Sequence, residues 1–144
     1  MKTDEFIERL QDAEIVAAIR HAEHGTSGEI RVFISRKPAP DAVAAAQRQF
    51  ERLGMTKTRE RNGVLFFLAP RSRTFAIVGD QAIHAHCGEG FWKKLASEMT
   101  EDFRQAQFTR GLVQGITRAG ELLAEHFPRQ PDDKNELPDS VERD

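Results

Sequence analysis

The sequence predicts an α/β domain in which helices cover both faces of a mixed central sheet. Residues 64–69 read VLFFLA and contain no polar residue, so both faces of this strand must be buried. A short turn at residues 70–73 leads into a second apolar run at residues 74–79, which predicts an antiparallel hairpin. A strand and a helix precede this hairpin, and together they predict a three-layer α/β/α sandwich with one βαβ unit and one β-hairpin.

Hydrophobic spacing predicts the remaining elements in chain order. Apolar residues on one helical face, followed by Gly25, predict a helix before the first strand. Alternating residues then predict that strand, and Asp41 is placed to cap the next helix, which ends at Gly54. Aromatic residues in the last two helices are expected in the core. The predicted helices span residues 4–10, 12–24, 41–54, 89–104 and 107–126, and the first strand spans residues 28–35.

Length and composition indicate one domain. A chain of 144 residues can bury a core without disulfides, and its single cysteine, Cys87, cannot pair within the chain. Charges recur through the first 19 residues, so we expect no signal peptide, no membrane segment and a cytoplasmic protein. The net charge of -2 argues against nucleic-acid binding. Four arginines around the hairpin are interpreted as solvated charges: Arg59, Arg61, Arg71 and Arg73.

The composition of the chain changes near residue 128. Residues 128–144 contain six acidic and three basic residues, and three prolines oppose regular structure there. Only Leu137 and Val141 offer apolar side chains that would anchor this segment. We therefore expect a single domain over residues 1–127 and an acidic, proline-containing, disordered tail over residues 128–144.

Topology brings three oxygen-bearing side chains to one edge of the predicted sheet. Parallel strands begin at the same edge, so Glu29 is expected beside Asn62. The hairpin register brings Asp80, which follows the third strand, to the same edge. Hard divalent cations prefer carboxylate and amide oxygens. Asp80, Asn62 and Glu29 are therefore the candidate ligands of a weakly bound, partly hydrated calcium or magnesium ion.

An interpretation without a metal accounts for the same residues. Glu29 can pair with Arg31 or Arg61. Asn62 can cap a turn, and Asp80 can accept hydrogen bonds from backbone amides at the end of its strand. The residues alone leave both interpretations open.

A loop is expected after Asp80, and it contains His84, His86, Cys87 and Glu89. Imidazole and thiolate groups suit zinc or copper. An extended segment places the two histidines on one side and the cysteine on the other, so at most two ligands converge. We therefore interpret this segment as a loop without a zinc site.

Six short sequence motifs follow one another in order. They are SGEIRV at residues 27–32, LGM at 53–55, NGVL at 62–65, VGD at 78–80, GFW at 90–92, and Phe108 with GL at 111–112. Together they resemble the TPM-domain family, named after a thylakoid lumen protein, a photosystem II repair protein and a nematode membrane protein. The resemblance spans residues 26–127, and the chain looks like a short, soluble, bacterial-type member.

The resemblance implies an α/β/α sandwich, calcium or magnesium binding as in several relatives, and acid phosphatase activity as in plant members. The family's exported members typically carry a signal peptide and often a membrane anchor, and their Gly-Tyr-Gly motif is Gly79-Asp80-Gln81 in this chain. The expected function is a non-catalytic module that binds calcium or magnesium and acts through an unknown protein partner. The alternative is a weak metal-assisted acid phosphatase, in which a cation at Asp80 polarises a phosphate.

Overall fold

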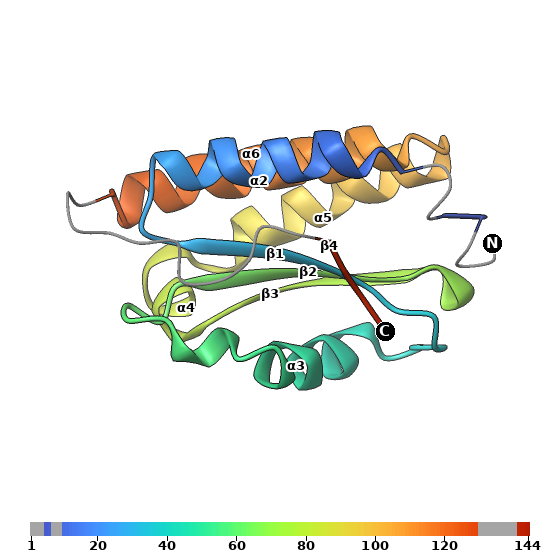
Figure 1. The fold of residues 1–144 in the computed structure, drawn as a ribbon, viewed down its shortest axis with the longest axis horizontal. Helices are drawn as coiled ribbons and strands as arrows, with labels where there is room; N and C mark the ends of the chain where they lie inside the picture. The colour runs from blue at the N-terminus through green and yellow to red at the C-terminus, as the bar shows by residue number, and fades with distance from the viewer. Residues whose placement is uncertain (1–4, 7–9, 130–140) are drawn as a thin grey trace.

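Helices cover both faces of a central sheet, as the sequence predicts (Figure 1). The computed structural model describes residues 5–6, 10–129 and 141–144. Of the helical turn expected at residues 4–10, residues 5 and 6 are helical, whereas residues 4 and 7–9 lie outside the described residues. The elements are α2 (Asp12–His24), β1 (Glu29–Ile34), α3 (Ala42–Arg52), the 3-10 helix η1 (Met55–Lys57), β2 (Gly63–Ala69), the 3-10 helix η2 (Pro70–Ser72), β3 (Thr74–Gly79), α4 (Gln81–Cys87), α5 (Glu89–Arg104), α6 (Phe108–His126) and β4 (Val141–Arg143).

The sheet is mixed, with the strand order β3-β2-β1-β4. Strands β1 and β2 are parallel and place Glu29 opposite Gly63, because the connection through α3 is a crossover. Strands β2 and β3 are antiparallel, with Val64 opposite Gly79 and Ala69 opposite Thr74. This hairpin register is the one that the sequence predicts.

Each face of the sheet packs against its own helix layer. Helix α3 lies on one face, and α2, α5 and α6 lie on the other (Figure 1). Alternation along β2 sends Leu65 and Phe67 into the core beside α3, whereas Val64 and Phe66 join the larger core on the other face. Every residue of β2 is buried, which explains why the strand carries no polar side chain.

Helix α6 has 19 residues and lies against both α2 and α5. Its buried stripe includes Leu112, Ile116 and Leu123. A Cβ atom on Gly120 would lie 2.5 Å from the Cβ of Ala22, so only glycine permits the close approach of α6 to α2. Neither α6 nor any other helix in the described part of the chain is long and apolar enough to cross a membrane.

The end of the chain departs from the expectation of a disordered tail. Residues 141–143 form β4, which runs parallel to β1 at the edge of the sheet. The carboxylate of Glu142 lies 2.7 Å from the guanidinium of Arg31, whose side chain is 6% exposed. Residues 141–143 pair with β1 and with Arg31 only in the folded domain, so the composition of the segment does not predict the strand. Residues 141–143 are therefore ordered, contrary to the expectation, and residues 130–140 lie outside the described residues.

Candidate functional site at one rim of the sheet

The three predicted site residues lie where three strands meet one rim of the sheet. Glu29 begins β1, Asn62 immediately precedes β2, and Asp80 immediately follows β3. The backbone N–H of Asp80 donates to the carbonyl of Gly63 at 2.9 Å, which extends the hairpin ladder to the rim. All three residues are buried. We call this group, with the neighbouring Ser27, Glu60 and Arg61, the rim site.

Asn62 belongs to a small polar cluster with Ser27 and Glu60. Its Nδ2 donates to the Ser27 Oγ at 3.0 Å and to the Glu60 Oε2 at 3.2 Å. The Ser27 hydroxyl in turn donates to the same Glu60 oxygen at 2.5 Å. The Oδ1 atom of Asn62 is buried and accepts no hydrogen bond from any described residue. An amide oxygen in this state is an acceptor whose desolvation is not compensated.

Sequence reasoning missed Glu60 as a member of this cluster. Glu60 is exposed, but its carboxylate accepts a hydrogen bond from the buried side-chain amide of Asn62, two positions later in the chain. The sequence does contain a signal for Glu60, because this carboxylate lies two positions before the candidate ligand Asn62. The position of Ser27, by contrast, depends on the parallel pairing of β1 and β2.

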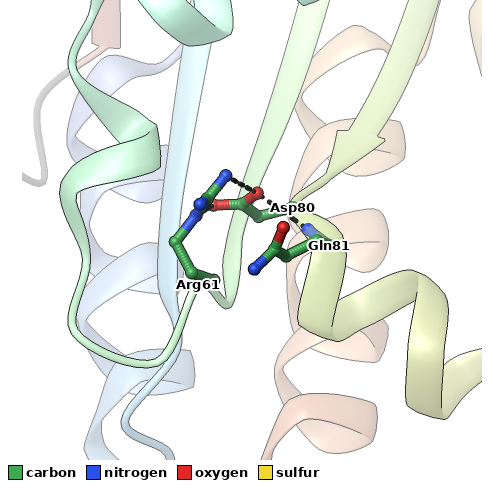
Figure 2. Close-up of polar contacts among 3 residues, drawn as sticks. All are labelled: Arg61, Asp80 and Gln81. Carbon is green, nitrogen blue, oxygen red and sulfur yellow. Dashed lines mark hydrogen bonds and ion pairs between the residues drawn. The ribbon is translucent and has the colours of Figure 1, made fainter.

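Asp80 is engaged by an arginine and by the start of a helix (Figure 2). The Nε and Nη2 atoms of Arg61 donate to its two carboxylate oxygens at 2.8 and 2.9 Å. The backbone N–H of Gln81 donates to Oδ1 at 2.7 Å. The hydrogen bonds from Arg61 to Asp80 raise the pKa of Arg61, while partial desolvation opposes the increase. The sequence predicts Arg61 to be a solvated charge; its side chain is 38% exposed, but it also forms a bidentate ion pair with Asp80.

Backbone contacts hold Arg61 in an unusual conformation. Its φ angle is 53°, in the left-handed region that residues other than glycine rarely adopt. The N–H of Arg61 donates to the carbonyl of Thr58 at 3.3 Å, and its carbonyl accepts from Ala82 at 3.1 Å. The backbone is thus fixed from both sides at the residue that reaches Asp80. Strained residues of this kind often cluster at functional sites.

The segment after Asp80 is a helix, whereas the sequence predicts a loop. Helix α4 spans Gln81–Cys87, and the Asp80 side chain caps its first turn. Ile83 is fully buried and anchors the helix in the core. His84, His86 and Cys87 therefore lie on a helix and not on an extended segment. Their side chains and that of Glu89 lie outside what the structure describes, so the zinc interpretation stays untested.

The rim site offers oxygen atoms of the types that hard cations bind, but Asp80 is largely occupied. Within the described residues, no group of three or more His, Cys, Asp or Glu side chains is arranged to hold a metal ion. A cation at this rim would need amide, hydroxyl or backbone oxygens in addition to carboxylates. The donor set fits calcium or magnesium in kind, since Asn62 Oδ1 is buried without a donor. Asp80 would have to share its carboxylate with Arg61 or release it.

Comparisons with known proteins identify the family. The TPM domain model matches residues 1–122. The chain is also similar to the BA42 protein from the psychrophilic bacterium Bizionia argentinensis, whose structure was determined by NMR. The match has a TM-score of 0.85 and 39% sequence identity, and it covers 94% of this chain and 95% of that chain. No curated protein matches the chain. The family model and the solved structure each match most of the chain, so this chain belongs to the TPM domain family.

Proposed function

We propose that this chain is a non-catalytic, divalent-cation-binding TPM module. Calcium or magnesium would bind at the rim site through oxygen atoms of Asp80, Asn62 and Glu29. Binding would then alter how this rim contacts a protein partner. The observation that carries the proposal is the Oδ1 atom of Asn62, which is buried and accepts no hydrogen bond from the described residues. A cation would satisfy this oxygen.

Competition with Arg61 explains why the proposed site would be weak. Asp80 accepts two hydrogen bonds from the guanidinium, which already supplies a positive charge at this carboxylate. The Arg61 side chain is 38% exposed, so it can move into water when a metal ion arrives. The bound cation would keep several water ligands, as is usual for magnesium.

Titration followed by backbone amide resonances tests the proposal. Adding calcium or magnesium chloride should shift the amides of Glu29, Asn62 and Asp80 before those of α5 and α6. Asp80→Asn should weaken binding, because the variant loses a carboxylate charge. Arg61→Gln should strengthen binding, because the variant removes the competing guanidinium. Asp41→Asn is the matched control, since Asp41 also caps a helix but lies on exposed surface far from the rim.

Three results would contradict the proposal: shifts confined to residues 129–144, equal affinity in Asp80→Asn and the unchanged protein, or weaker binding in Arg61→Gln. The same samples test the alternative function, a weak metal-assisted phosphatase. Hydrolysis of p-nitrophenyl phosphate that requires magnesium and disappears in Asp80→Asn would favour that alternative over a non-catalytic module. The cytoplasmic location expected from the sequence stays a prediction.

A further inference from the structure

A second candidate binding site lies at the opposite end of the hairpin from the rim site. A cavity of about 620 Å³ opens where the hairpin turn, the end of α5 and the start of α6 come together. Small-molecule sites in proteins typically have volumes of about 300–1,000 Å³. Four phenylalanines and two arginines line the cavity, and we call it the aromatic pocket. They are Phe6, Phe75, Phe103, Phe108, Arg73 and Arg104.

The phenylalanine rings form one connected apolar wall. The ring centroid of Phe103 lies 5.3 Å from that of Phe75, 6.0 Å from that of Phe108 and 6.5 Å from that of Phe6. An apolar ligand of matching shape would remove this surface from water and gain edge contacts with the rings. The wall therefore favours a ligand with an aromatic or alkyl body.

The polar groups of the pocket differ in their availability. The hydroxyls of Thr74 and Thr100 already donate to backbone carbonyls, at 2.6 and 2.8 Å. Among the described residues, the Arg104 side chain has only one ion pair, which is exposed and weak and joins it to Glu101 at 3.8 Å. The side chain of Arg73 forms no hydrogen bond or ion pair with any residue in the described part of the chain. The arginines are thus the groups that a ligand can engage.

The charge of the pocket selects the sign of the ligand. No Asp or Glu occurs among the described residues that line it, whereas two arginines do. Guanidinium groups bind carboxylates through parallel hydrogen bonds in a fixed geometry. We propose that the aromatic pocket binds a small amphiphilic monocarboxylate. Its apolar body would lie among the phenylalanines, and its carboxylate would pair with Arg73 and Arg104.

A matched pair of probes tests this proposal on the full chain. 4-Phenylbutyrate carries a carboxylate and 4-phenylbutan-1-ol carries a neutral hydroxyl on the same apolar body. Titration with the acid should shift the amides of Phe75, Phe103 and Ala106 and give intermolecular NOEs to the phenylalanine rings. Arg73→Asn should weaken binding of the acid about twofold to fivefold, as expected for an exposed ion pair. The same variant should leave the affinity for the alcohol unchanged.

Controls separate the charge from the cavity. Asparagine tolerates the left-handed backbone of residue 73, so Arg73→Asn should fold. Arg48→Gln removes an exposed arginine from α3 and should change neither affinity. The proposal is overturned if the acid gives no NOEs to the phenylalanine rings up to its solubility limit. It is also overturned if Arg73→Asn affects the acid and the alcohol equally, or if Arg48→Gln matches its effect.

Discussion

The two ends of the β2–β3 hairpin use arginine in opposite ways. At the rim site, Arg61 is paired bidentately with the buried carboxylate of Asp80. At the aromatic pocket, the Arg73 side chain has no such partner among the described residues and stands beside a cavity lined by phenylalanines. At the rim, Arg61 neutralises the Asp80 carboxylate, so a cation must compete with it for that group. The pocket leaves its charge available to an anion.

Backbone strain occurs at both ends. Among the described residues, the non-glycine residues with positive φ are Arg61 at the rim and Arg73 and Ala106 at the pocket. Each conformation costs about 1–2 kcal/mol for a residue that carries a Cβ atom. At the rim, hydrogen bonds to Thr58 and Ala82 offset this cost. At the pocket, Ala106 is exposed and its strain is removable by substitution.

The largest expected effect tests how tightly the rim is packed. In Gly79→Ala, the new Cβ would lie 2.7 Å from Cγ2 and 2.9 Å from Cβ of Ile83. Ile83 is branched and fully buried, so α4 must move and the free energy of unfolding should fall by about 1–3 kcal/mol. Urea denaturation measures the loss.

Gly90→Ala is the control for this variant. Nothing lies within 4 Å of the position that its Cβ would take, and the residue lies in α5. Replacing glycine with alanine in a helix should raise stability by about 0.5–1 kcal/mol. If Gly79→Ala leaves the free energy of unfolding unchanged, the rim end of the hairpin is not tightly packed around Gly79, and the contrast drawn between the two ends fails there.

The second prediction compares two capping aspartates. Asp80 caps α4 and pairs with Arg61. The Asp41 side chain is exposed, and among the described residues it accepts only the N–H of Ala44, at 3.1 Å. Asp41→Ala should lower the free energy of unfolding by about 1 kcal/mol, and Asp80→Ala by about 2 kcal/mol, the upper end for a lost cap. Equal losses in urea denaturation would mean that the ion pair at the rim contributes nothing to stability.

The smallest expected effect concerns the pocket end. Ala106→Gly removes a left-handed strain of about 1–2 kcal/mol but adds about 0.5–1 kcal/mol of backbone entropy in the unfolded chain. The net result should be a gain of between roughly 0 and 1.5 kcal/mol, measured as a higher urea midpoint. Ala17→Gly, on the exposed side of α2 and inside the helix, should instead cost about 1 kcal/mol. Losses of the same size in both variants would show that Ala106 is not strained.

Much of the fold was predictable because its signals are local and long. Helix α2 has the predicted bounds, and the hairpin register follows from the short turn at residues 70–73. Helix α4 was missed because its seven residues are too few to show a helical period, and its stability depends on the Asp80 cap and buried Ile83. Strand β4 was missed because its three residues acquire partners only at the folded edge of β1.

The sequence by itself determined the layers, the order of the central strands and the meeting of Glu29, Asn62 and Asp80 at one rim. These follow from hydrophobic periodicity and chain topology, which act over short distances along the chain. The tertiary structure decided the partners of each side chain. Arg61 reaches Asp80 only because Thr58 and Ala82 fix its backbone, and Arg73 lines a cavity only because α5 and α6 close over the hairpin turn. Except for the turn contact between Thr58 and Arg61, these contacts join segments far apart in the chain, and no local pattern encodes them.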